Sequence, residues 1–99
     1  MHVIARKPFA DAIKKFPSDS ATIENTYNIL KRGEFKTPEE LSKVFSSIDC
    51  FKYKDTWRVI DIGSNNLRML AFIEFRHNRI YVKHIISHKE YDTLCKKYQ

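Results

Sequence analysis

The sequence predicts an α+β domain, in which N-terminal helices pack on one face of a small antiparallel β-sheet and a short C-terminal helix follows. Three observations support this prediction. Apolar residues recur at helical spacing in the first half of the chain, and the period becomes that of strands after Cys50. Two Ser/Thr-x-x-Glu capping boxes mark helix starts. Short polar turns separate the later apolar runs, which favours antiparallel neighbours.

The first two predicted helices are defined by their apolar stripes and their ends. One spans about residues 8–16, and Pro17 ends it. The next begins at N-cap candidates among residues 18–20, and Gly33 is a good C′ terminator for it. The residues expected to face inward recur at i, i+3, i+4 or i+7: Phe9, Ile13, Phe16, Ile23, Tyr27 and Leu30.

A third, short helix is predicted after the first capping box. Thr37 is its N-cap, Pro38 suits the first helical position, and Glu40 occupies the third. Its inward-facing residues should be Leu41, Val44 and Phe45.

The second half of the chain contains the predicted sheet. Turns at 63–66 and 76–79 connect a meander, and residues 51–53 can add an edge strand before it. Ser87 and Glu90 form the second capping box, which opens a helix through about residue 97. The three main strands are 57–62, 67–75 and 80–86.

Strand alternation assigns side chains to the two faces of the sheet. On the second main strand, Leu67, Met69, Ala71 and Ile73 share one face, opposite Arg68, Leu70, Phe72 and Glu74. On the third, Ile80, Val82, His84 and Ile86 alternate with Tyr81, Lys83 and Ile85.

Arg68 is the unusual residue of this pattern, because it places a charge at the start of a largely apolar strand. A buried, unpaired guanidinium would be energetically costly. We therefore expect Arg68 to pair with an acid or to point into an open cleft. The candidate acids are Asp61, Glu74 and Asp92.

The chain has 99 residues, of which 42% are hydrophobic, so we expect one folded domain, 1–99. The formal net charge is +6. Residues 1–49 carry eight Lys/Arg and seven Asp/Glu, and residues 50–99 carry ten and five, so +5 lies in the second half. That imbalance suggests a polyanionic or an acidic protein partner, or simply a solvated basic surface.

No apolar run is long enough to span a membrane, and the first residues do not form a signal peptide, so we expect a cytoplasmic protein without membrane contact. Cys50 and Cys95 are expected to be free thiols. The four histidines are scattered, and there is no HExxH, P-loop or GxGxxG motif, so no metal or cofactor is predicted.

Four residues could carry metal-independent cleavage of an RNA phosphodiester. Arg68 could hold the phosphate with its planar fork, with Lys83 as a second cation. His88 could transfer a proton near neutral pH, and Tyr91, one helical turn later, could stack on a base or orient an oxygen. The general base could be His88 itself, Glu90 or Asp92.

A basic and aromatic set is the candidate RNA-binding surface, because cations follow the phosphate backbone and rings stack on bases. Each member also has a purely structural interpretation. Arg68 commonly forms an ion pair, Tyr91 and Trp57 commonly pack in a core, and Lys83 in a strand guards against aggregation. The proposed RNA-binding residues are Lys52, Lys54, Trp57, Arg76, Arg79 and Lys89.

The order and spacing of several segments resemble the HigB-type toxins of bacterial type II toxin–antitoxin systems, in the RelE/ParE-like superfamily. The resemblance covers nearly the whole chain. It rests on Met1-His2-Val3-Ile4, Phe35-Lys36-Thr37-Pro38-Glu39, Val44-Phe45, Asp49-Cys50-Phe51-Lys52-Tyr53, Asn66-Leu67-Arg68 and His88-Lys89-Glu90-Tyr91-Asp92.

This resemblance implies a microbial-RNase-like α+β fold, ribosome-dependent cleavage of mRNA, and neutralisation by a helix-turn-helix antitoxin of HigA type. It implies contacts to ribosomal RNA, and to operator DNA only through the antitoxin. Superfamily members place an Arg on a central strand and a His or Tyr near the C-terminus, positions that Arg68, His88 and Tyr91 match. Lys83 is a weaker match.

Two other functions are compatible with the same residues. The first is a non-catalytic RNA- or ribosome-binding domain that blocks translation without cutting mRNA. The second is a toxin of the same fold that targets gyrase. The His88/Tyr91 pair argues against the gyrase target, because a pure protein binder needs no proton-transfer group there, whereas mapped RNA ends would separate the first alternative from a nuclease.

Overall fold

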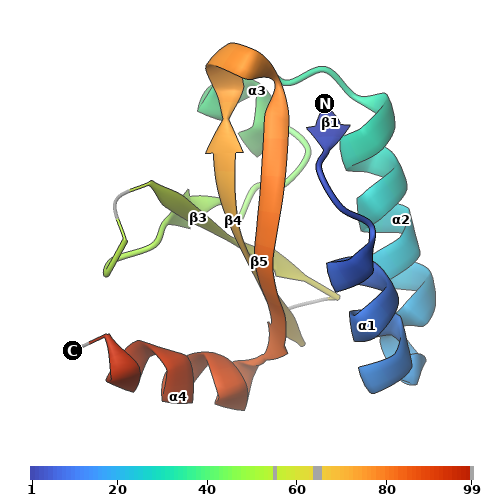
Figure 1. Cartoon of the computed structure of the whole chain (residues 1–99), viewed down its shortest axis with the longest axis vertical. Helices are drawn as coiled ribbons and strands as arrows, with labels where there is room; N and C mark the ends of the chain where they lie inside the picture. Colours follow the sequence, from blue (N-terminus) through green and yellow to red (C-terminus); the bar gives the residue numbers. More distant parts are fainter. Residues whose placement is uncertain (55, 64–65, 99) are drawn as a thin grey trace.

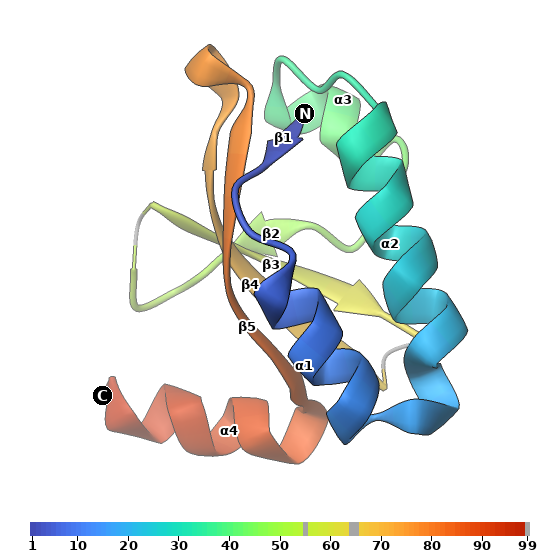
Figure 2. The same ribbon diagram turned by 45° about the vertical axis from the view of Figure 1, so that its right-hand side comes forward.

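Helices cover both faces of a five-stranded sheet in the computed structural model, which describes residues 1–54, 56–63 and 66–98 (Figure 1). The sheet has the order β1-β5-β4-β3-β2. Figure 2 shows α1 and α2 on one side of β5 and β4, with α4 at the lower end of the sheet. The α+β prediction is confirmed, except that the sheet is mixed and not purely antiparallel.

The predicted helices are present, with shifted ends. They are α1 (Lys7–Lys15), α2 (Ser20–Arg32), α3 (Pro38–Ser42) and α4 (His88–Lys97), and Pro17–Asp19 forms a 3₁₀ turn. Asp19 is the N-cap of α2 but makes no capping hydrogen bond with its side chain. None of these helices is long and apolar enough to cross a membrane within the part of the chain that the structure describes.

Gly33 ends α2 in a different way from the one predicted. It is the C-cap in extended backbone (φ −79°, ψ 159°), and its N–H donates to Ile29 O at 3.0 Å. Glycine is needed because a Cβ here would lie 2.6 Å from the ring of Phe35. Close approach of a core side chain, and not a left-handed turn, therefore explains this glycine.

The start of α3 follows the capping-box prediction only in part, because Glu40 bonds the N–H of Lys36 and not that of the N-cap Thr37, and the end of α3 differs from the prediction. Thr37 Oγ1 accepts from Glu40 N at 3.2 Å, and the Glu40 carboxylate accepts from Lys36 N at 3.0 Å. Leu41 is fully buried, but Val44 is 49% exposed, so the prediction that Val44 faces inward is wrong. The helix ends at Ser42, and the helical period that pointed Val44 inward ends with it.

Two short strands extend the predicted meander of β3 (Trp57–Ile62), β4 (Leu67–Glu74) and β5 (Arg79–Ser87). The edge strand expected at 51–53 is instead β2 (Asp49–Cys50), which pairs with β3. β1 (His2–Val3) was not predicted and runs parallel to β5. A two-residue strand has no periodic signal, so only its partner defines it. Of the turn predicted at 63–66, Ser64 and Asn65 lie outside the described residues.

A β-bulge at Lys83 overturns the predicted faces of β5. Leu70 pairs with His84, but the next residue of β4, Ala71, pairs with Val82, so Lys83 is the extra residue. Ile80, Val82 and Ile85 consequently face the N-terminal helices, and Tyr81, His84 and Ile86 share the opposite face. The prediction that Ile80, Val82, His84 and Ile86 share one face is therefore wrong.

Two apolar cores hold the layers together. The larger one joins α1, α2 and α3 to the sheet, around fully buried Phe9, Ile23 and Ile60. The smaller one, on the other face, consists of Phe51, Val59 and Leu70 beneath apolar residues of α4. Both cysteines are free, as predicted.

The smaller core determines where α4 lies. Tyr91, Leu94, Cys95 and Tyr98 recur at i, i+3, i+4 and i+7, so one stripe of α4 packs on the sheet. Both hydrogen bonds of the predicted Ser87–Glu90 capping box are present. Together they place the first turn of α4 where β5 ends, beside the start of β4.

Candidate active site

Arg68 is held at the end of the sheet by an ion pair across two strands. Asp61 of β3 lies directly opposite Arg68 of β4, and Arg68 Nη1 donates to Asp61 Oδ1. The two side chains are only 19% and 20% exposed, so the pair is largely shielded from water. Of the three candidate acids, Asp61 is therefore the partner of Arg68.

His88 is the first residue of α4 and lies against the same guanidinium. Arg68 Nη2 is 2.9 Å from His88 Nε2. Because a guanidinium can only donate, Nε2 is the acceptor, and the proton of the neutral ring is on Nδ1. That atom lies 3.6 Å from Asp92 Oδ2, one turn further along α4. His88 therefore lies between a cation at one ring nitrogen and a carboxylate at the other.

Tyr91 forms the wall of this cluster. The Cζ atom of Arg68 lies 5.2 Å from the centroid of the Tyr91 ring, within the range of a cation–π contact. The ring also packs against buried Phe51, at 6.2 Å between centroids and 62° between planes. Burial and a hydrogen bond with Cys95 raise the pKa of Tyr91 to about 12, so the phenol is neutral and does not act as a base near pH 7.

The raised pKa predicts an alkaline loss of stability that belongs to Tyr91. An unfolded tyrosine loses its proton near pH 10. Since the folded state holds the Tyr91 proton to about pH 12, this contribution is complete below about pH 10 and is lost as the pH rises towards 12. In urea unfolding, the free energy of unfolding of the wild type should fall more steeply over this interval than that of Tyr91→Phe. Equal slopes would contradict the assignment.

The Arg68 guanidinium retains N–H donors that can bind a ligand. Each Nη nitrogen carries two hydrogens, and Asp61 and His88 use one on each. The Nε atom is buried and lacks a hydrogen-bond partner within the described ranges. A phosphate approaching from the exposed side of His88, which is 56% exposed, could therefore bind to both Nη atoms.

Two residues considered for the chemistry lie outside this cluster. Lys83 is on the bulge of β5, where its Nζ lies 5.8 Å from the centroid of the Tyr81 ring. Glu90 caps α4 and forms an ion pair with Lys15 of α1, and the Lys15 hydrogen bond is the main cause of its lowered pKa. Glu90 is thus engaged in holding α4 against α1, whereas Asp92 contacts His88.

The candidate RNA-binding residues fall into three places. Lys54 Nζ lies 5.5 Å from the Trp57 ring centroid and 5.6 Å from that of Tyr98, which follows α4, and Lys52 lies on the same loop. Trp57 is also half-buried, stacked 5.9 Å from Phe51. Arg76 and Arg79 flank the hairpin at the opposite end of β4 from Arg68. Lys89 is exposed beside His88.

Two residues that support the site were not singled out by the sequence as parts of it. Phe51 is only 1% exposed and supports Tyr91, although the sequence suggested a strand residue there. Asp92 was one of several possible bases, and its i+4 spacing from His88 was the available sign that the two side chains are neighbours.

The chain is similar to known proteins over most of its length. A family model described as HigB_toxin, RelE-like toxic component of a toxin-antitoxin system, matches residues 19–94. An mRNA interferase HigB of Escherichia coli O6:H1 is 42% identical over 99 residues, covering 100% of this chain and 96% of the relative. An mRNA interferase toxin HigB of Escherichia coli K12 is 39% identical over 92 residues, covering 93% and 88% respectively.

An mRNA interferase HigB of Shigella flexneri is likewise 39% identical over 92 residues. The family model spans most of the chain, and these relatives are matched over nearly their whole length. This chain therefore belongs to the HigB family of RelE-like toxins, the toxic components of toxin–antitoxin systems.

Proposed function

We propose that this toxin is an mRNA interferase, a ribosome-dependent endoribonuclease that cuts mRNA during translation. The observation that carries the proposal is the convergence of Arg68, His88 and Tyr91 at one end of the sheet. A cation that binds phosphate beside a proton-transfer group supplies what RNA cleavage without a cofactor requires, and the Tyr91 ring adds a surface that can position the substrate. The relatives' names as mRNA interferases support the same activity.

In the proposed reaction, a substrate phosphate accepts hydrogen bonds from both Nη atoms of Arg68 and replaces His88 as an acceptor at Nη2, which frees the lone pair of His88 Nε2. That nitrogen then accepts the proton of the 2′-OH. The 2′ oxygen attacks phosphorus, the bond from phosphorus to the 5′ oxygen breaks, and the 5′ oxygen takes a proton from solvent. A 2′,3′-cyclic phosphate remains on the upstream fragment. Arg68 stabilises the charge that develops on the phosphoryl oxygens.

The remaining residues have supporting roles in this proposal. Asp92, 3.6 Å from His88 Nδ1, stabilises the imidazolium that forms when Nε2 accepts the proton. Tyr91 orients the substrate with a neutral phenol and its ring. Lys83 is not needed, since it lies on the bulge of β5 and not beside Arg68.

The proposed partners follow from the basic second half of the chain and from family membership. Lys52 and Lys54, beside the half-buried Trp57, would contact ribosomal RNA, as would Lys89 and the hairpin arginines. A helix-turn-helix antitoxin of HigA type would neutralise the toxin and carry the contacts to operator DNA. Action on translating ribosomes would take place in the cytoplasm.

Primer extension on a reporter mRNA tests the proposal. The purified toxin is added to a translation extract, and a parallel reaction has initiation blocked. New 5′ ends that appear only during active translation are the expected result. Ends in both reactions would indicate a free ribonuclease. Halted translation with intact mRNA would overturn the catalytic proposal in favour of a binding inhibitor, and DNA damage without mRNA cleavage would indicate a gyrase-directed toxin.

A further inference from the structure

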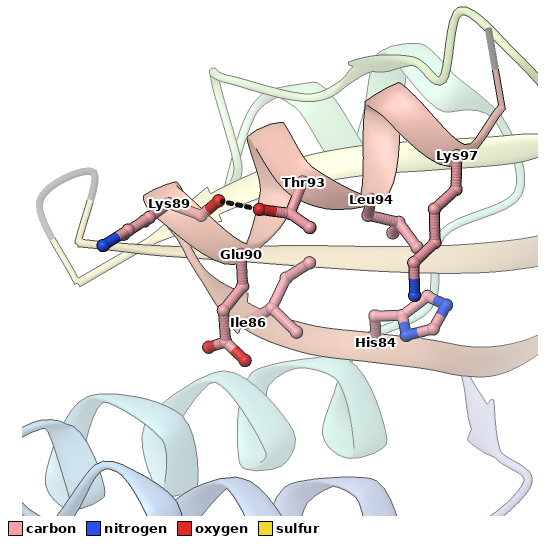
Figure 3. A pocket seen from close by; sticks show the side chains of 7 residues that line it. All are labelled: His84, Ile86, Lys89, Glu90, Thr93, Leu94 and Lys97. Atoms are coloured by element: carbon pink, nitrogen blue, oxygen red, sulfur yellow. Dashed lines mark hydrogen bonds between the residues drawn. The ribbon is translucent and has the colours of Figure 1, made fainter.

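The flank of α4 that faces away from His88 borders a groove with an apolar floor. A hollow of about 390 Å³ lies between α4 and β5 (Figure 3). Ile86 of β5 and Leu94 of α4 line its floor, and both are only half-buried. Lys89 lies near the start of α4, and Lys97, near its end, reaches towards His84. The hollow is thus apolar below, with Lys97 at one end; at the other end Lys89 points away from it, and the Glu90 carboxylate, paired with Lys15, lies beside Ile86.

A second hollow extends this groove along β5 towards α1. It encloses about 220 Å³ between α1 and β5, and shares His84 and Ile86 with the first. The outer edge of β5 is open here, because β1 pairs only with Arg79 and Ile80 among the residues that the structure describes. An unpaired strand edge offers backbone donors and acceptors to an incoming chain.

The groove carries a net positive charge. Its acids are already engaged, since Glu90 pairs with Lys15, and Asp11 pairs with Lys7 at 2.9 Å. Lys83, Lys89 and Lys97 have no acidic partner within the described parts of the chain. The pKa of His84 is affected by the same positive charges. Burial lowers its pKa, and the charges of Lys83 and Lys97 lower it further.

We propose that this groove, formed by the two hollows along β5, is the docking site for an acidic segment of the antitoxin that also carries apolar side chains. Aliphatic floor residues favour a protein over RNA, because single-stranded RNA binds by stacking on flat rings. Such rings gather around Trp57, which lies 5.9 Å from the His84 ring at the edge of the groove, and not on its aliphatic floor. The inference rests on the antitoxin partner proposed above and not on the RNA-cleaving reaction.

The position of the groove has a consequence for inhibition. His88 and Asp92 lie on one flank of α4, and Thr93 and Lys97 lie on the other, with Tyr91 against the sheet between them. An antitoxin segment in the groove would therefore contact the flank of α4 opposite His88 and would leave Arg68 accessible. Inhibition would come from its bulk, which keeps the toxin out of the ribosome.

Charge reversal at two neighbouring lysines tests the inference. Lys97 lines the groove, and Lys96, also exposed and on the same helix, does not. The Kd of the cognate antitoxin is measured by calorimetry for the full-length wild type, Lys97→Glu and Lys96→Glu. At about 50 mM salt, Lys97→Glu should weaken binding at least fivefold and Lys96→Glu less than twofold, with the difference shrinking at about 300 mM salt. Equal effects of the two variants would overturn the inference.

A second measurement does not depend on a variant's stability. Hydrogen exchange of the wild-type toxin should slow over residues 83–86 and 93–97 when the antitoxin binds, and unchanged exchange there would overturn the inference. Weaker binding of a single-stranded RNA oligonucleotide by Lys97→Glu, with antitoxin binding intact, would also overturn it and assign the groove to RNA. Failure of the nuclease proposal would show instead as intact mRNA with the wild type.

Discussion

Replacing Arg68 by alanine is expected to lower the rate of mRNA cleavage by about 10²–10³-fold, the usual effect of removing one group that stabilises charge in the transition state. The guanidinium is held by Asp61 and contacts His88 at 2.9 Å, so it is the preorganised cation of the site. Ribosome binding should change far less than cleavage, because many exposed lysines remain. Single-turnover cleavage and ribosome cosedimentation measure the two quantities separately.

Stability has to be separated from catalysis in this experiment. Arg68→Ala leaves the carboxylate of Asp61, which is only 20% exposed, without its partner. The double variant Arg68→Ala/Asp61→Asn removes that unpaired charge and should recover stability without recovering cleavage. Arg68→Lys keeps the charge but loses the planar fork, and should recover only part of the rate. Normal cleavage by Arg68→Ala would show that the residue is a structural ion pair only.

Replacing His88 by alanine is expected to lower the cleavage rate by about 10²–10⁴-fold, the range for loss of a positioned proton-transfer group. His88→Gln offers Arg68 an acceptor but cannot exchange a proton, so it should be nearly as slow. The exposed neighbour Lys89 provides a control on the same turn, since Lys89→Ala should affect ribosome binding more than the chemical step. Single-turnover rates on programmed ribosomes measure these effects.

A modified substrate tests which proton His88 moves. When sulfur replaces the 5′ oxygen, the leaving group no longer needs a proton. If His88 is the general base at the 2′-OH, as its accepting Nε2 suggests, the defect of His88→Ala should persist with this substrate. If the modified substrate restored the rate, His88 would be the general acid instead. Equal rates of wild type and His88→Ala on normal RNA would exclude both roles.

Much of the secondary structure could be predicted because its signals are local. The capping box of Ser87 and Glu90 placed the start of α4, since a side chain and a backbone N–H three residues away suffice to form it. The same holds for Thr37 at α3. β1 had no such signal, because a two-residue strand is stabilised only by its partner β5, which lies far along the chain.

The bulge at Lys83 shows where alternation fails. Strict period two placed Ile80 and His84 on one face, but one extra residue in β5 reverses every face after it. Whether a strand bulges depends on how its neighbours pack. The neighbours of β5 are β4, α1 and α4, so its local sequence alone does not specify the bulge. His84 consequently lines the groove beneath α4 and is not part of the larger core.

By itself, the sequence determined the α+β class, the helix starts, the basic second half, and the residue types that an RNA-cleaving site requires. Only the tertiary structure decided that Arg68 pairs with Asp61, and that His88 rather than Glu90 faces the guanidinium. The physical reason is the distance along the chain between the residues that interact. Caps and periodicity depend on residues three or four apart, whereas this site depends on the register of β3 with β4 and on the core that seats α4.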